Sequence, residues 1–146
     1  MNKTIGFIGC GNMAQAMISG IVKSNLVCSE KVIASNPSER SLNKVKKEYS
    51  ILVTNDNKEV AKFSDIVILA VKPYKYLEVI EEIKASLKKD VVVVTIAAGI
   101  TLDYMRNALG DTAKVIRTMP NTPALVGEGM SALRSEERRV GKECSQ

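Results

Sequence analysis

The sequence predicts an α/β fold in which a single domain is built on a doubly wound, mainly parallel sheet. Short apolar runs alternate with amphipathic stretches along the 146-residue chain, as in βαβ units. The first apolar run, residues 4–8, leads directly into Gly9-Cys10-Gly11-Asn12-Met13-Ala14. This segment fits the pattern G-x-G-x-x-G/A, with a strand expected before it and a helix after it. That context indicates a Rossmann-type fold with a dinucleotide site.

Each small residue of this segment has a physical role. Gly9 permits a tight turn, Gly11 lets the backbone approach a pyrophosphate, and Ala14 lets the helix pack closely on the strand. The N–H groups of the first helical turn, where Asn12 and Met13 lie, would face the phosphates. The alternative is a glycine-rich strand–helix turn without a ligand.

Five further strands follow from the apolar runs. The segments 65–71 and 91–95 are apolar without alternation, as strands buried on both faces should be. Further strands are expected at 31–35 and 113–117, and a short one at 51–53.

Helices are predicted between the strands. The first begins near Asn12 and the second follows an N-cap at Ser38 and runs to about Tyr49. A short helix is expected at 56–62, and another from Thr101 to about Leu109. Between them, an apolar stripe at helical spacing predicts a helix that buries Leu77, Ile80, Ile83 and Leu87.

The composition excludes several classes of protein. No apolar run approaches the ~20 residues of a membrane span, and Gly9 and Gly11 interrupt any signal peptide. Cys10, Cys28 and Cys144 are scattered without CxxC spacing, which argues against a disulfide framework and a zinc site. The chain has no histidine, the commonest metal ligand, so no metal is expected. We therefore expect a reduced, cytoplasmic protein.

The net charge of +5 is dispersed among acidic residues and accompanied by only four Tyr and two Phe. This argues against a nucleic-acid surface. A mild positive field would still favour an anionic cofactor.

The end of the second strand bears on the choice of cofactor. NAD sites usually place an acid there for the ribose 2′-OH. Here the stretch is Ser35-Asn36-Pro37-Ser38-Glu39-Arg40, in which Asn36 is neutral and both Ser38 and Arg40 can donate to a 2′-phosphate. NADP is therefore favoured and NAD stays possible. Alternatively, the segment is only a turn and helix cap in which Glu39 offsets Arg40.

Four segments together resemble the amino-terminal half of pyrroline-5-carboxylate reductase. They are GFIGCGNMAQAM (6–17), LAVKP (69–73), TIAAGI (95–100) and MPNTPALVGEGMSAL (119–133). The resemblance implies NAD(P)H-dependent reduction of 1-pyrroline-5-carboxylate to proline, the last step of proline biosynthesis. It also implies a homo-oligomer for the full-length family, whose helical second domain dimerises and supplies much of the imino-acid pocket. Nothing in residues 134–146 resembles that domain.

The resemblance also implies site residues, although it names no catalytic one. Asn57 corresponds to a contact of the adenine-side ribose, or is simply a helix-starting polar residue. Other implied contacts of the cofactor follow the ends of later strands. They are Ala70, Val71, Lys72, Pro73, Ala97, Ala98, Met119, Pro120 and Asn121. Their alternatives are a solvated lysine at Lys72, tight packing at the alanines and an ordinary proline-rich loop.

These observations suggest a division of the chain. We expect residues 1–133 to be a dinucleotide-binding domain that is poorly active alone. Residues 134–146, of which seven are charged, form either a solvated helix or a cloning-derived tail, and we favour the tail. Two alternatives stay open: a dehydrogenase of the 3-hydroxyacid or 6-phosphogluconate type, and a non-catalytic nucleotide-sensing domain.

Overall fold

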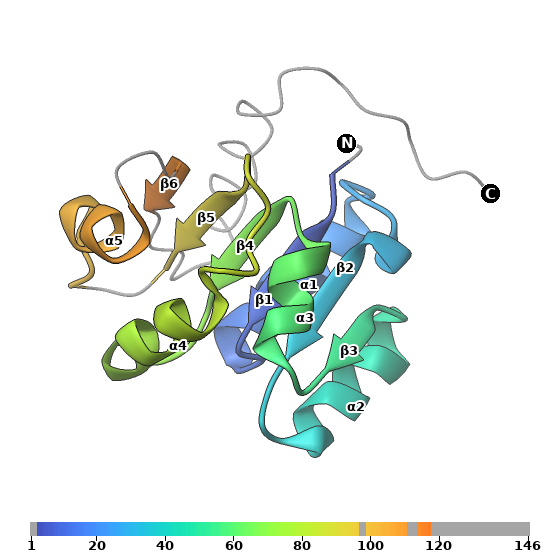
Figure 1. Cartoon of the computed structure of the whole chain (residues 1–146). Helices are drawn as coiled ribbons and strands as arrows, with labels where there is room; N and C mark the ends of the chain where they lie inside the picture. Colours follow the sequence, from blue (N-terminus) through green and yellow to red (C-terminus); the bar gives the residue numbers. More distant parts are fainter. Residues whose placement is uncertain (1–2, 97–98, 111–113, 118–146) are drawn as a thin grey trace.

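Six parallel strands form one sheet in the order β3-β2-β1-β4-β5-β6 (Figure 1). The computed structural model describes residues 3–96, 99–110 and 114–117. The strands are β1 (Ile5–Ile8), β2 (Val32–Ser35), β3 (Leu52–Thr54), β4 (Ile66–Leu69), β5 (Val92–Thr95) and β6 (Lys114–Arg117). The expected doubly wound parallel sheet is confirmed.

Strand β1 lies inside the sheet, between β2 and β4. Ile5 is the register partner of Val32 on one side and of Ile66 on the other. The chain first builds outward from β1 to β3 and then crosses back to β4. The strand order therefore reverses between β1 and β4, and ligands of open α/β sheets bind beyond the carboxyl ends of the strands at such a point.

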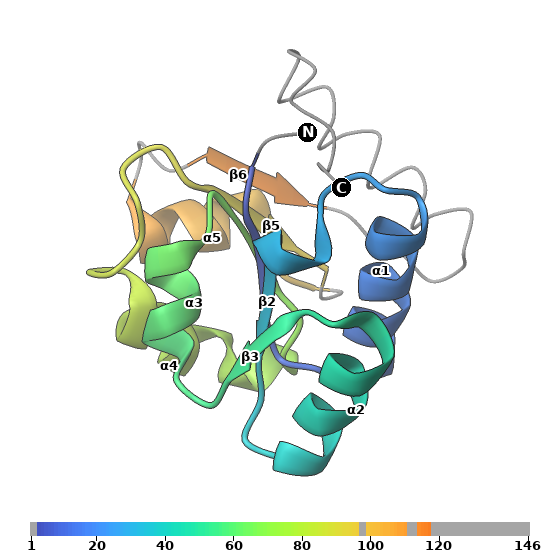
Figure 2. The same ribbon diagram turned by 90° about the vertical axis from the view of Figure 1, so that its right-hand side faces the viewer.

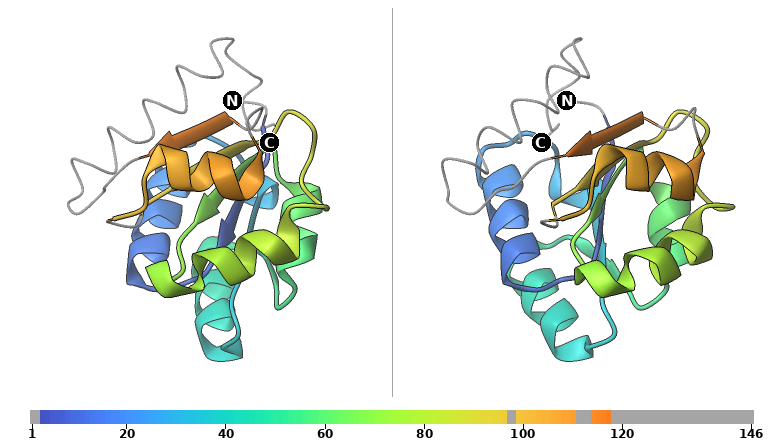
Figure 3. Two further views of the ribbon diagram at one scale, coloured as in Figure 1. Left: turned by 60° about the vertical axis from the view of Figure 1, so that its left-hand side comes forward. Right: turned by 90° about the vertical axis from the view of Figure 1, so that its left-hand side faces the viewer.

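Helices cover both faces of the sheet (Figure 2). Helices α1 (Asn12–Lys23) and α2 (Glu39–Tyr49) cover one face. Helices α3 (Asn57–Phe63), α4 (Tyr76–Ile83) and α5 (Leu102–Leu109) cover the other. In Figure 3, α5 and β6 lie at one end of the sheet, away from α2. Within the described ranges, no helix is long and apolar enough to cross a bilayer.

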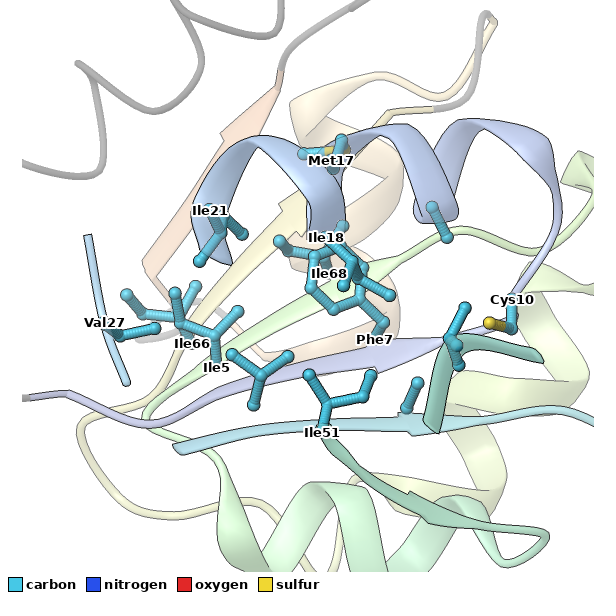
Figure 4. Close-up of a cluster of buried hydrophobic side chains, with 14 of the residues drawn as sticks. Ile5, Phe7, Cys10, Met17, Ile18, Ile21, Val27, Ile51, Ile66 and Ile68 are labelled. Atoms are coloured by element: carbon cyan, nitrogen blue, oxygen red, sulfur yellow. The ribbon is translucent and has the colours of Figure 1, made fainter. Parts of the chain in front are cut away.

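The central strands are apolar on both sides because each face of the sheet has its own core. Ile5 and Phe7 of β1 pack into one core with α1, as Figure 4 shows, whereas Ile8 belongs to the core on the opposite face. Ile66 and Val67 of β4 divide in the same way. This arrangement explains why these runs show no alternation of apolar and polar residues.

The predicted helix after Pro73 is shorter and rotated. Helix α4 ends at Ile83, and Leu77 is 54% exposed, so the prediction that Leu77 is buried is wrong. Ile80 and Ile83 are buried as predicted, and Leu87 is half-buried beyond the end of the helix. A short 3-10 helix, Pro73–Lys75, precedes α4. The face that a helix buries depends on where it begins, and this turn places Tyr76, rather than Leu77, against the sheet.

Each of the six strands begins one residue after its predicted start, and two of them, β3 and β4, also end at a different residue. Strand β3 begins one residue later than the predicted 51–53, and β4 is shorter than the predicted 65–71. Asp65 lies directly before β4, where its N–H donates to the carbonyl of Thr4 and its side chain accepts from the Thr4 N–H. Its carbonyl accepts from the N–H of Val92 in β5, so Asp65 is hydrogen-bonded to the segments on both sides of β4.

Candidate functional site

Gly9 lies where the ends of β1, β2 and β4 meet. Its φ is +102°, a value that side chains other than glycine's rarely adopt. Its N–H donates to the carbonyl of Ser35 at 2.9 Å. A Cβ atom at Gly9 would lie 2.8 Å from the carbonyl oxygen of Ala70. The turn after β1 therefore requires glycine both for its conformation and for its contact with the β4 loop.

Gly11 differs, because no atom of the described residues lies close to the position of a Cβ. A Cβ atom there would meet nothing within 4 Å among the described residues. Gly11 is the N-cap of α1, and the first turn of α1 has neither a side-chain cap nor an acidic residue. The N–H groups of Asn12 and Met13 belong to the helix end that lacks intrahelical acceptors, and both residues are exposed. A helix N-terminus with this surrounding space fits a pyrophosphate.

Two hydrogen bonds from side chains outside the loop hold the backbone of Cys10, which lies between Gly9 and Gly11. The N–H of Cys10 donates to Oδ1 of Asn36 at 3.1 Å, and its carbonyl accepts from Nε2 of Gln15 at 3.0 Å. The sequence identified Asn36 only as a neutral residue at the end of a strand. Neither tie follows from a motif, because Asn36 lies 26 positions away and Gln15 belongs to the helix.

The surroundings of Cys10 favour a packing role for its side chain. Cys10 is 1% exposed, and burial raises the pKa of its thiol, which suits a packing residue better than a reactive nucleophile (Figure 4). Cys28 is half-buried and is the N-cap residue of the short 3-10 helix, Ser29–Lys31, that precedes β2. In the described part of the chain, no cluster of three His, Cys, Asp or Glu could hold a metal ion.

Ser38 and Arg40 present polar groups beside the end of β2. Ser38 is the N-cap of α2, as predicted, but its hydroxyl makes no capping hydrogen bond. Arg40 is exposed in the first turn of α2 and forms no ion pair with Glu39 or any other described residue. Both side chains are therefore free to contact an anion. Ser38 therefore occupies the cap position without a hydrogen bond from its hydroxyl, and no ion pair joins Glu39 to Arg40 in the described residues.

Asn57 is held by partners on two other elements. It begins α3, and its Oδ1 accepts from the hydroxyl of Ser35 at 2.6 Å. Its Nδ2 donates to Oε1 of Glu82 in α4 at 3.1 Å. Ser35 is fully buried, so its hydroxyl orients Asn57 instead of reaching a ligand. Sequence reasoning missed Glu82, which lies 25 positions from Asn57 and belongs to no motif.

The loop after β4 lies beside Gly9. Ala70 and Val71 are half-buried there, and the N–H of Ala70 donates to the carbonyl of Ile8 at 2.8 Å. Lys72 and Pro73 are exposed at the start of the 3-10 helix. The remaining predicted contacts lie outside the described residues and stay predictions. They are Ala97, Ala98, Met119, Pro120 and Asn121.

Residues 4–99 match the family described as NADP oxidoreductase coenzyme F420-dependent. Pyrroline-5-carboxylate reductase of Escherichia coli K12 is 44% identical over 133 residues, which are 91% of this chain and 49% of that protein. The solved pyrroline-5-carboxylate reductase of Coxiella burnetii superposes with a TM-score of 0.83 at 29% identity, covering 97% of this chain and 57% of that one. Pyrroline carboxylate reductase of Plasmodium falciparum, solved with NADP bound, gives 0.74 at 32% identity, covering 86% and 45%.

The chain belongs to this NADP oxidoreductase family, since the match extends over more than half of its length. It spans about half the length of the curated relatives that it matches. The resemblance to the amino-terminal half of pyrroline-5-carboxylate reductase is confirmed.

Proposed function

We propose that this member of the NADP oxidoreductase family is the cofactor-binding half of a pyrroline-5-carboxylate reductase. The whole enzyme would reduce 1-pyrroline-5-carboxylate to proline, the last step of proline biosynthesis. The observation that carries the proposal is the uncapped N-terminus of α1 next to the open side of Gly11, at the β1/β4 switch point. The similarity to reductases of that name supports the substrate class.

The loop after β1 would hold the part of the cofactor that NADP and NAD share. The N–H groups of Asn12 and Met13 would donate to the pyrophosphate, and the positive end of α1 would favour its charge. The close packing of Gly9 against Ala70 keeps this loop next to the end of β4.

The end of β2 would select NADP over NAD. Ser38 and Arg40 are exposed, and the hydroxyl of Ser38 makes no capping hydrogen bond. Asn36 adds no negative charge. A 2′-phosphate could therefore accept charge-assisted hydrogen bonds here. Asn57, oriented by Ser35 and Glu82, would contact the ribose on the same side. NAD stays possible because nothing in this arrangement blocks an unphosphorylated ribose.

When bound, NADPH supplies the hydride that reduces the C=N bond. The residues of this chain would act mainly by orientation, because a cyclic imine is basic enough to arrive partly protonated. The absence of histidine from the whole sequence agrees with a cofactor domain that carries no general acid. The β4 loop, 70–73, and the segments 97–98 and 119–121 would surround the nicotinamide.

The imino acid would be held largely by residues beyond this half. We propose that residues 1–133 form the cofactor domain and that the chain alone reduces its substrate poorly. Without groups to hold the substrate, the reaction would lose a proximity contribution that reaches about 7–11 kcal/mol in well-oriented systems. We also propose that the complete enzyme is a cytoplasmic homo-oligomer and that residues 134–146 are a cloning-derived tail.

The decisive experiment combines binding with turnover. The purified chain is titrated with NADPH and NADH by calorimetry, and NADPH oxidation is followed with 1-pyrroline-5-carboxylate. A chimera, in which residues 1–133 replace the matching half of the E. coli reductase, provides the missing half. We expect the chain to bind NADPH and turn over slowly, and the chimera to turn over at a rate comparable with the E. coli enzyme.

The other outcomes separate the alternatives. If neither cofactor binds, the cofactor role is wrong. If the chain binds cofactor but the chimera is inactive on the imine, a sensing domain or a dehydrogenase of another substrate class is favoured. If the chain alone is as active as the chimera, the substrate pocket lies within these residues.

A further inference from the structure

A buried tyrosine hydroxyl joins the ends of β4 and β5. Tyr76, at the start of α4, is fully buried. Its hydroxyl donates to the carbonyl of Leu69 at 2.8 Å and accepts from Oγ1 of Thr95 at 2.8 Å. Leu69 and Thr95 are register partners at the last paired position of their strands. One hydroxyl group therefore contacts the final residue of each of two neighbouring strands.

The polar nature of this contact is unusual for the interior of the domain. Among the described residues, the buried polar side chains are Ser35, Ser64 and Thr95. Ser35 and Thr95 both lie at the carboxyl end of a strand, and both are hydrogen-bonded there. A phenylalanine at position 76 could fill the same space but could not make either hydrogen bond.

The bridge continues into the candidate site. The residue after Leu69 is Ala70, whose N–H donates to the carbonyl of Ile8 at the end of β1. The carbonyl of Ala70 in turn packs against Gly9. The ends of β1, β4 and β5 are thus connected through one chain of direct contacts, from the glycine loop to Tyr76.

The two halves of a doubly wound sheet each receive one half of a dinucleotide. The groups suited to a 2′-phosphate lie at the end of β2, which assigns the adenosine half to β1, β2 and β3. The nicotinamide half would then lie over the ends of β4 and β5. Tyr76 lies directly behind those two ends.

We propose that Tyr76 is a positioning residue for the nicotinamide half of the cofactor, acting through Leu69 and Thr95. The proposal rests on the proposed binding of NADP(H). The hydroxyl of Tyr76 holds the last residues of β4 and β5 in fixed relation, and therefore also the start of the loops that follow them. Removing the hydroxyl deprives the buried Thr95 hydroxyl of its acceptor, which costs more than the loss of an exposed hydrogen bond.

The test compares two ligands that differ by the nicotinamide half. NADPH contains both halves, whereas adenosine 2′,5′-bisphosphate contains only the adenosine half. In Tyr76→Phe we expect NADPH binding to weaken about 3- to 10-fold by calorimetry, the range of one hydrogen bond, while the bisphosphate binds as before. Thr95→Val removes the other side of the bridge at nearly constant volume and should give the same result.

A control variant separates this effect from general destabilisation. Ile80→Val removes a methylene group from the same helix and the same core without touching the bridge. It should lower the thermal unfolding temperature but leave the ratio of the two affinities unchanged. Folding of every variant is checked by circular dichroism, and Thr95→Val carries the test if Tyr76→Phe does not fold.

The outcomes are distinct. A reduced ratio of NADPH to bisphosphate affinity in the two bridge variants, but not in Ile80→Val, supports the proposal. If the wild-type chain binds NADPH but the two bridge variants lose affinity equally for both ligands, or lose none, the positioning role of Tyr76 is wrong. The proposed function is not affected by that result. A wild-type chain that binds neither ligand overturns the proposed function, and this inference with it.

Discussion

The N–H of Cys10 donates to Oδ1 of Asn36 at 3.1 Å and thereby joins the loop after β1 to the end of β2. Asn36 therefore has two tasks in the proposed site. Its side-chain oxygen fixes the loop that would bind the pyrophosphate, and its lack of charge leaves the 2′ position of the ribose open to a phosphate. These two tasks can be separated by substitution, because aspartate keeps the acceptor oxygen and adds a negative charge.

Asn36→Asp should change the preference for cofactor while preserving the loop. The carboxylate can still accept from Cys10, but it would repel a 2′-phosphate and accept from a ribose 2′-OH. We expect NADPH to bind more weakly by roughly tenfold, or about 1.4 kcal/mol, with NADH unchanged or slightly tighter. Parallel calorimetric titrations measure both affinities.

Asn36→Ala is the matched variant, since it removes the acceptor without adding charge. It should weaken NADPH and NADH to a similar extent, because the loop that both share loses its tie. A loss confined to NADPH in Asn36→Ala would contradict the structural role of the Cys10–Asn36 hydrogen bond.

Arg40→Ala tests the 2′-phosphate directly. The side chain is exposed and forms no ion pair with another described residue, so its loss should leave stability nearly unchanged. NADPH binding should weaken by roughly 1–3 kcal/mol, the scale of a charge-assisted hydrogen bond, and NADH binding should change little. Lys46→Ala, which removes an exposed cation from the last turn of the same helix, is the control for general charge. Equal losses for the two cofactors would rule out the 2′-phosphate role.

Substitutions at the two loop glycines should destabilise the fold to different extents. Gly9→Ala should destabilise the fold by roughly 1–3 kcal/mol, because φ is +102° and the new Cβ would lie 2.8 Å from the Ala70 carbonyl oxygen. In Gly11→Val the new Cβ would meet no atom of the described segments within 4 Å, so the cost to stability should stay within about 1 kcal/mol. Urea unfolding measures both.

Gly11→Val should affect cofactor binding strongly, although it leaves the stability of the fold nearly unchanged. The valine side chain would occupy the space proposed for the pyrophosphate, so Gly11→Val should weaken NADPH and NADH alike. A folded Gly11→Val variant with wild-type affinity for both would place the phosphates elsewhere.

Asp65 should make stability depend on pH in the acid range. Partial burial acts to raise the pKa of Asp65, but hydrogen bonds from Thr4 and the ammonium of Lys88, 3.1 Å away, outweigh it and lower the pKa below its usual value. The stabilisation is therefore present above about pH 4, the ordinary carboxyl pKa, and is lost as the pH falls through the lowered value. Since 31% of the Asp65 side chain is exposed, we expect no more than about 1 kcal/mol.

Asp65→Asn isolates this contribution. The variant should be less stable than the wild type at pH 7, and the difference should shrink toward pH 3. Urea unfolding at pH 7, 5 and 3 gives the comparison. A difference that stays constant over this range would show that the charge of Asp65 does not contribute.

Much of the fold could be predicted because its signals are local. The unbroken apolar run at 65–71 indicated a strand buried on two faces, and β4 lies at the centre of two cores. The helix after Pro73 was predicted less well, because apolar spacing gives a helical period without its phase. The 3-10 helix before α4 set that phase and turned Leu77 toward solvent.

The features of the candidate site also fall into those set by the local sequence and those set by contacts between distant segments. The sequence by itself determined where the glycine loop after β1 would lie, because the requirement for glycine at Gly9 and the helix after Gly11 are consequences of local backbone geometry. It also determined the neutral end of β2. Only the tertiary structure decided that Asn36 holds Cys10, that Glu82 holds Asn57 and that Tyr76 joins β4 to β5. These are contacts between side chains and distant segments, and they exist only once the parallel sheet has brought the carboxyl ends of its strands to one edge.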